Sequence, residues 1–157
     1  MSNQQIEFEL PDSIKSQMFT IRSKCSQVFT TLRKGYAESI YQRALGVEFQ
    51  IDHIPHDMEV NIPIAYRGHE IGVIRADIIL RGDPPIIIET KATYYPLRQE
   101  ERWQLIRYMR QKHIEYGVLV NFPQIQGVTK PFLDVIVEYN DEFYNVDLDS
   151  GFAVLIQ

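Results

Sequence analysis

The spacing of apolar residues predicts three helices. In the segment 13–34 apolar residues recur three and four positions apart, which is the pattern of a helix with one buried face. A second segment repeats this pattern and breaks before Pro55, with its apolar positions at Ile40, Ala44, Val47 and Ile51. A third follows Pro96 and continues to about His113. We therefore expect each helix to bury its own apolar stripe.

Alternating and continuous apolar runs predict the strands. Met58–Tyr66 alternates apolar and polar positions, and Pro63 within it favours a place near the edge of a sheet. Ile71–Leu80 follows a turn as a second strand, and the short apolar run Ile86–Ala92 is typical of the middle of a sheet. Tyr116–Phe122 follows the third helix, so we expect it to run parallel to the strand before that helix.

The remainder of the chain is rich in short strands. Phe132–Tyr139 and Glu142–Leu148 flank a tight turn and predict a β-hairpin, and Phe152–Ile156 predicts one more strand. Hairpins joined to a helical crossover give a mixed sheet covered by helices, of class α/β or α+β. The polar segment Ser2–Glu9 is expected to be frayed and outside this fold.

Length and composition favour one globular domain. The chain has 157 residues, of which 45% are hydrophobic and 24% charged, and this balance excludes a disordered or collagen-like protein. No stretch approaches the roughly 20 apolar residues that cross a bilayer, and the N-terminus lacks the pattern of a secretory signal. The single cysteine, Cys25, excludes an internal disulfide. We therefore expect an intracellular protein, in the cytoplasm or nucleus, that is neither secreted nor membrane-bound.

The negative charge is concentrated near the C-terminus. The net charge is −5, but the segment from Pro131 onward holds six acidic residues and no Lys or Arg. Removing these six charges leaves the segment 1–130 at +1. The overall acidity therefore does not exclude a nucleic-acid partner for the main body of the chain.

Two carboxylates and a lysine lie in apolar strands. Asp77 lies inside the strand 71–80, where a carboxylate is costly to bury without a partner. Glu89 and Lys91 follow three isoleucines and are two positions apart, so both project from one face of a strand. On neighbouring strands Asp77 and Glu89 would lie close together, and two like charges then require a proton or a cation between them. Oxygen ligands without nearby His or Cys favour Mg²⁺ or Mn²⁺.

This set of residues admits two interpretations. The functional one is metal-assisted hydrolysis of a phosphodiester, with Lys91 holding or helping to deprotonate a water. The structural one is an ion pair between Lys91 and Glu89, with Asp77 capping a turn. The residues alone leave both open.

Several motifs occur in an order that resembles a known family. The segment Gly35–Tyr41 reads GYAESIY and places Gly35, Glu38 and Tyr41 at the spacing that names the GxxExxY protein family, a branch of the PD-(D/E)XK nuclease superfamily. The other matching segments, in chain order, are Tyr66–Gly68, Ile74–Asp77, Ile88–Ala92, Gln104–Tyr108 and Gly117–Phe122. Their order and spacing together are specific, and they cover roughly residues 17–123.

The resemblance implies a fold and an activity. The fold is a restriction-endonuclease-like core, a central mixed β-sheet flanked by helices, within a single domain 1–157. The core would span 13–123, and an acidic β-rich extension would span 128–157. The activity is hydrolysis of DNA with Mg²⁺ or Mn²⁺ as cofactor, in a process such as DNA repair, recombination or replication.

The resemblance also implies the catalytic residues. Asp77 and Glu89 fall on the metal-binding acids of the superfamily, and Lys91 falls on its lysine. Glu38 corresponds to an additional metal-binding acid that many members supply from the first helix of the core. Ala76 stands where the superfamily name has a proline, which is a common change.

Four further residues are candidates for contact with the substrate. Gln104 and Tyr108 match a Q-x-x-x-Y signature of the RecB-like and phage-exonuclease-like branches, whose residues lie near the active site and DNA. Tyr41 shares a helix face with Glu38, and Arg75 precedes the strand acid by two positions and is placed for a phosphate contact. Ordinary core or rim positions are the alternative for the two tyrosines.

The third predicted helix is basic, with a local charge of +3. Its charged residues are Arg98, Glu100, Glu101, Arg102, Arg107, Arg110 and Lys112. Phosphate binding and a merely solvated helix face are both compatible with this pattern.

A second function of another class is also open. A nuclease-like fold that is catalytically weak or inactive can serve as a DNA- or protein-binding module, and the small size and acidic tail of this chain fit that role. The segment 132–156 would then add strands to the sheet of its own chain or pair with a second copy to form a homodimer.

Overall fold

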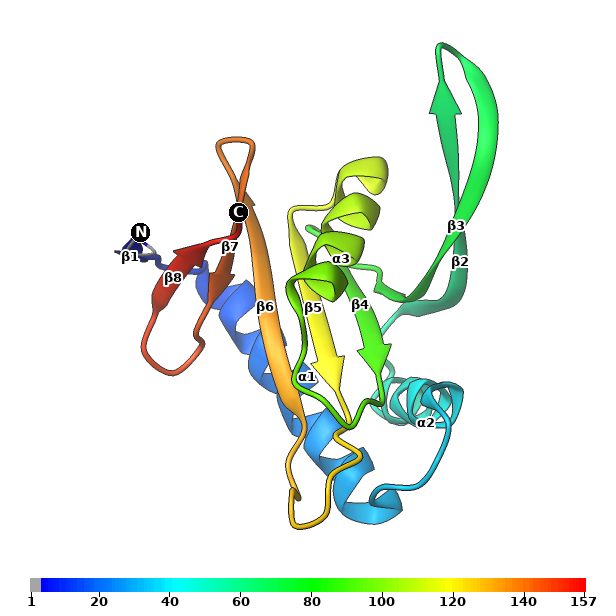
Figure 1. Cartoon of the computed structure of the whole chain (residues 1–157), viewed down its shortest axis with the longest axis vertical. Helices are drawn as coiled ribbons and strands as arrows, with labels where there is room; N and C mark the ends of the chain where they lie inside the picture. The colour runs from blue at the N-terminus through cyan, green and yellow to red at the C-terminus, as the bar shows by residue number, and fades with distance from the viewer. Residues whose placement is uncertain (1–3) are drawn as a thin grey trace.

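The structure is a computed structural model that describes residues 4–157. Within this range one eight-stranded sheet has α1 and α2 packed on one face and α3 on the other (Figure 1). The helices are α1 (Asp12–Leu32), α2 (Glu38–Ile51) and α3 (Gln99–Lys112). The strands are β1 (Gln5–Glu7), β2 (His56–Tyr66), β3 (His69–Leu80), β4 (Ile86–Lys91), β5 (Tyr116–Asn121), β6 (Phe132–Tyr139), β7 (Glu142–Val146) and β8 (Phe152–Leu155).

The order of strands confirms the predicted mixed sheet. Across the sheet the order is β1-β8-β7-β6-β5-β4-β3-β2. Strands β4 and β5 are parallel, because α3 connects them as a crossover, and the other neighbouring strands are antiparallel. Strand β2, which contains Pro63, forms one edge, and β4 lies in the interior of the sheet, as the sequence predicts.

The side chains of β4 alternate between the two faces of the sheet and join both cores. Ile86 and Ile88 pack with the side chains of α1 and α2, whereas Ile87 packs with those of α3. All three isoleucines are fully buried. Helix α1 buries the predicted apolar stripe, and Cys25 takes the small core position that the pattern favours.

Helix α2 buries the face opposite to the one predicted from its pattern. Of the four residues of the expected stripe, Ile40, Val47 and Ile51 are exposed to solvent, and only Ala44 is partly buried against the core. The large side chains buried instead are Tyr41, Leu45 and Phe49. These also lie four residues apart, so the helix has an apolar stripe on each side, and tertiary packing selects the one with the larger side chains.

The N-terminal segment belongs to the sheet, contrary to expectation. Strand β1 pairs with β8 through Gln5, Ile6 and Glu7, and the backbone N–H of Phe8 donates to the carbonyl of Gly151 at 2.9 Å. These hydrogen bonds compensate for the polar sequence of the segment. The first part of the predicted frayed segment, residues 2–3, lies outside the described residues.

The acidic C-terminal extension continues the same sheet. Strand β6 pairs with the whole length of β5, β7 pairs with β6, and β8 lies between β7 and β1. These three strands therefore have no free edge to offer to a second copy, and the homodimer expected through them has no open strand to use. Among residues 4–157, none of the helices has both the length and the apolar composition needed to cross a bilayer.

The hairpin formed by β2 and β3 extends beyond the rest of the sheet. The two strands pair from His56 and Leu80 out to Tyr66 and His69, and the tip projects away from the helices (Figure 1). Strand β4 pairs with only the last three residues of β3, which end at Leu80. Strand β3 therefore separates from β4 at Asp77, the residue before the three that pair with β4.

We predict that the C-terminal extension contributes to the core. Ile136 of β6 is fully buried, so Ile136→Ala should lower the free energy of unfolding by about 2–5 kcal/mol. Phe132, on the same strand, is 55% exposed, and Phe132→Ala should cost less than about 1 kcal/mol. Urea unfolding followed by circular dichroism measures both. Equal effects of the two substitutions would contradict this packing.

Candidate active site

The candidate site lies where β3 separates from β4. Backbone pairing between the strands ends at Ile78 and Ile88, so Asp77 and Glu89 are the first residues beyond it. The backbone N–H of Asp77 donates to Oε1 of Glu89 at 2.9 Å. The backbone N–H and the hydroxyl of Thr90 both donate to Oδ2 of Asp77 at 2.8 Å. Hydrogen bonds to carboxylates thus replace the missing backbone ladder and hold the two acids close together.

Strand β2 is also irregular at this point. Glu59 lies between the pairs that Met58 and Val60 form with β3, directly opposite Asp77, and its φ is 52°. A positive φ is uncommon for a residue other than glycine and costs free energy. The pairing of Asp77 is therefore interrupted on both sides, as is common for strand residues next to functional sites. The sequence carries no signal for this irregularity.

The Glu89 carboxyl group is buried beside other acids. Glu89 is only 4% exposed, and its pKa is raised to about 8. Burial is the largest cause of this rise. The charges of Asp77 and Glu38 raise the pKa further, whereas the hydrogen bond from the Asp77 N–H and the charge of Lys91 lower it. In the absence of a cation, Glu89 therefore holds a proton near neutral pH.

Glu38 lies near this pair but does not join it. It is the first residue of α2, where a negative charge is favoured by the helix dipole. Partial burial raises its pKa, the Lys91 charge lowers it, and the Asp77 charge raises it. Within residues 4–157 no three His, Cys, Asp or Glu side chains gather closely enough to hold a metal ion. The cluster of three acids expected from the sequence is therefore not assembled in this structure.

The loop that leads to Glu38 is anchored by Gln124. The N–H of Gly35 donates to Oε1 of Gln124 at 2.6 Å, and Nε2 of Gln124 donates to the Tyr41 hydroxyl at 3.1 Å. The same hydroxyl donates to the carbonyl of Arg33 at 2.6 Å. Gly35 has a φ of 117°, which favours glycine. Gly35 and Tyr41 therefore place the first turn of α2, which carries Glu38.

Tyr41 is a supporting residue in this arrangement. Its side chain is fully buried and stacks on Phe122, with ring centroids 4.8 Å apart. A side chain without exposed surface offers no direct contact to a substrate, so the substrate contact expected of Tyr41 is not possible in this structure. Gln124, which lies in the loop after β5, carries no pattern by which the sequence could have identified it.

Lys91 is held by the residues of the Q-x-x-x-Y signature. Its Nζ donates to Oε1 of Gln104 at 2.9 Å, and Nε2 of Gln104 donates to the Tyr108 hydroxyl at 3.1 Å. Burial raises the pKa of Tyr108, and the charge of Glu89 raises it further. Helix α3 therefore reaches across the face of β4 from which Glu89 and Lys91 project.

A second glutamine fixes the backbone at Asp77. Gln42 is buried, and its Nε2 donates to the carbonyl oxygen of Asp77 at 3.2 Å. Gln42 lies four residues after Glu38, so both are on the same side of α2, and this spacing is the signal that would have identified it. Helix α2 thus contacts the site through Gln42 and places Glu38 nearby.

Two arginines near the site are exposed, and a third is already paired. Arg75 lies on β3 before Asp77, and Arg107 lies next to Tyr108 on α3, where its charge lowers the pKa of that tyrosine. Arg102, also on α3, instead forms an ion pair with Asp134 of β6 at 2.8 Å. The basic helix is therefore only partly available to an external phosphate.

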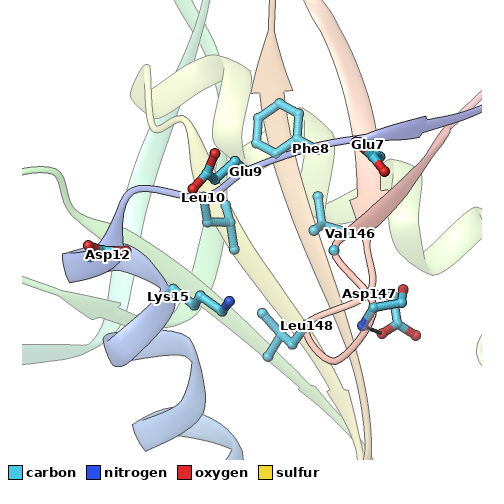
Figure 2. Close-up of a pocket in the computed structure, with 11 residues that line it drawn as sticks. Glu7, Phe8, Glu9, Leu10, Asp12, Lys15, Val146, Asp147 and Leu148 are labelled. Atoms are coloured by element: carbon cyan, nitrogen blue, oxygen red, sulfur yellow. Dashed lines mark hydrogen bonds between the residues drawn. The ribbon is translucent and has the colours of Figure 1, made fainter.

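A pocket of about 430 Å³ lies at the other end of the sheet. It is lined by residues 7–10, which lead into α1, by Asp12 and Lys15 of α1, and by the turn between β7 and β8 (Figure 2). None of the site residues predicted from the sequence lines it. This pocket is therefore separate from the candidate site.

Comparison with known proteins identifies the family. Residues 15–131 match the model of a family described as the PD-(D/E)XK nuclease superfamily. The chain belongs to this superfamily. The solved structure titled "Crystal structure of SSO0001" superposes with a TM-score of 0.51 and 22% identity, over 73% of this chain and 54% of that chain. The chain thus spans about half the length of that protein. None of the curated proteins compared with the sequence matches it.

Membership of the PD-(D/E)XK superfamily confirms the fold class inferred from the sequence. The matched range contains Asp77, Glu89 and Lys91, together with the signature residues of α3. It ends just before β6, so most of the C-terminal extension lies beyond the part that this family describes. The residues at the division of the sheet therefore lie within the part of the chain that this family describes.

We predict that Glu89 makes stability depend on pH. In the presence of a chelator, the folded state keeps the Glu89 proton up to about pH 8, whereas the unfolded state releases it near the ordinary pKa of 4.5. The folded state binds the proton more tightly, so the free energy of unfolding falls as pH rises through this window. The slope reaches about 1.4 kcal/mol per pH unit for one proton.

Replacing the titrating group removes this dependence. Urea unfolding of the wild type and of Glu89→Gln is measured at several pH values between about 4.5 and 8. The difference between the two proteins isolates the contribution of the Glu89 carboxyl group, because they share every other titrating group. The difference in stability should move in favour of Glu89→Gln as pH rises. Parallel curves for the two proteins would show that the Glu89 carboxyl group does not titrate as described.

Proposed function

We propose that this protein is a divalent-metal-dependent deoxyribonuclease of the GxxExxY branch. The observation that carries the proposal is the hydrogen-bonded pair of Asp77 and Glu89, with Lys91 alongside, in a chain of the PD-(D/E)XK superfamily. We infer an intracellular role in DNA repair, recombination or replication. The GYAESIY motif at Gly35–Tyr41 supports the assignment to the branch.

The chemistry of the carboxylate pair fits Mg²⁺ or Mn²⁺. Each acid uses one oxygen for the hydrogen bonds that position it, and within residues 4–157 Asp77 Oδ1 and Glu89 Oε2 accept none. Oxygen donors with nearby negative charge suit a hard divalent ion, which would also relieve the repulsion between them. Asp77 and Glu89 would hold the ion, and Glu38, which lies outside this pair in the structure, would become a further ligand when the ion draws it closer. Such an ion supplies Lewis-acid polarisation of the phosphate.

Lys91 contributes a positioned positive charge. Gln104 accepts a hydrogen bond from one of its three N–H donors, and Tyr108 in turn holds the amide of Gln104. The other two donors of Lys91 can orient the attacking water and stabilise negative charge that develops on the phosphate. Gln104 and Tyr108 are therefore positioning residues that act through Lys91.

The exposed arginines supply contacts to the DNA backbone. Arg75 lies on the same strand as Asp77, and Arg107 lies on the helix that carries Gln104. Both side chains are exposed, and neither forms an ion pair with another described residue. Arginines in these positions can bind phosphates on either side of the scissile bond without reading the base sequence.

A cleavage assay tests this function. The purified protein with Mg²⁺ or Mn²⁺ should cut at least one of linear, nicked, branched and single-stranded DNA, and a chelator should stop it. Lys91→Ala should lower the rate about 10²- to 10³-fold, as expected for loss of a donor that stabilises developing negative charge. Lys15→Ala, on the exposed surface of α1, is the matched control and should retain the wild-type rate.

The same assay distinguishes the binding-module alternative. If the wild type and Lys91→Ala are equally inactive on all four substrates, the enzymatic proposal fails. Retention of DNA binding in both proteins would then favour a nuclease fold that acts as a binding module.

A further inference from the structure

The exposed stripe of α2 has the features of a helix interface. Ile40, Val47 and Ile51 are 39%, 51% and 63% exposed, and Ala44, which lies between them, is partly buried against the core. The opposite side of the helix is fully occupied by the core. A continuous apolar stripe on the exposed side of one helix is unusual for a surface that faces only water.

The stripe has the spacing of a coiled-coil seam. Successive apolar positions are four, three and four residues apart, which is the alternation of a and d positions in a heptad. In this register Ile40 and Val47 are d positions, and Ala44 and Ile51 are a positions. Apolar side chains at a and d positions pack as knobs into holes on the facing helix.

The charges beside the stripe select one occupant and one orientation. Arg43 and Glu48 flank the seam at the g and e positions, and neither forms an ion pair with another described residue. They are five residues apart, so they cannot pair within their own helix. In a parallel pair of helices, the g residue of each copy lies next to the e residue of the following heptad in the other copy. Arg43 of each copy would therefore pair with Glu48 of the other, which gives two symmetric ion pairs. An antiparallel pair would instead bring like charges together.

We propose that this protein forms a two-fold homodimer in which the exposed stripes of two α2 helices pack in parallel. The interface is isologous, since each residue of the seam meets its own copy across the axis. Helix α2 has 14 residues and is thus about 21 Å long, so the contact is small and the association weak and concentration-dependent. This inference does not depend on nuclease activity.

The dimer would place two candidate sites on one side of the assembly. Glu38 begins α2, and in a parallel pair the two N-termini lie at the same end of the interface. Two sites related in this way can address a single nucleic-acid molecule.

Charge reversal with rescue tests the interface. Sedimentation equilibrium should show a monomer–dimer equilibrium for the wild type, and Arg43→Glu or Glu48→Arg should each weaken it by at least about 10-fold. The double variant, Arg43→Glu with Glu48→Arg, should recover the wild-type affinity to within about threefold. Ile71→Glu, at a 66% exposed apolar residue of the β2–β3 hairpin, is the control and should leave the equilibrium unchanged.

A cross-linking experiment tests the orientation. In a parallel pair Val47 faces its own copy, so Val47→Cys should form a disulfide-linked dimer under mild oxidation. Cys25 is fully buried and should not compete. A wild type that stays monomeric up to about 1 mM overturns the proposal. A dimer that is insensitive to both charge reversals, or that does not cross-link through residue 47, overturns it as well.

Discussion

The candidate site depends on a buried carboxylate at the point where the sheet divides. Glu89 is fixed by the N–H of Asp77, and Asp77 is fixed by Thr90, because the two strands no longer share a backbone ladder there. Burial and the neighbouring Asp77 charge raise the pKa of the Glu89 carboxyl group, and two acids held this closely favour a cation between them. The hydrogen bonds that organise the site are thus also the cause of its unusual electrostatics.

Three glutamines connect this pair to the surrounding elements. Gln42 joins α2 to the backbone of Asp77, Gln104 joins α3 to Lys91, and Gln124 joins the loop after β5 to the residues that precede Glu38. A glutamine both donates and accepts hydrogen bonds without adding charge, so it can bridge charged groups without disturbing their balance. The site is therefore assembled from both faces of the sheet, and its chemistry is carried by residues that the core holds in place.

The sequence was sufficient for the architecture and insufficient for several contacts. Alternation in β2 and the continuous apolar run of β4 predict where these strands lie. The alternation does not predict which core each side chain joins, because Met58 packs with α1 and α2 whereas Ile62 packs with α3. Helix α2 was oriented wrongly because it is apolar on two sides, and Ile40 and Tyr41 compete for the core. The positive φ of Glu59 and the bridge made by Gln124 arise from packing between distant segments, which a local pattern cannot reveal.

A crystal soaked in Mn²⁺ tests the central claim most directly, through the anomalous scattering of the ion. The account predicts a peak about 2.0–2.2 Å from oxygens of both Asp77 and Glu89, and no such peak in crystals of Glu89→Gln. A wild-type crystal without density between these two carboxylates, at a concentration of Mn²⁺ that supports DNA cleavage, would contradict the account.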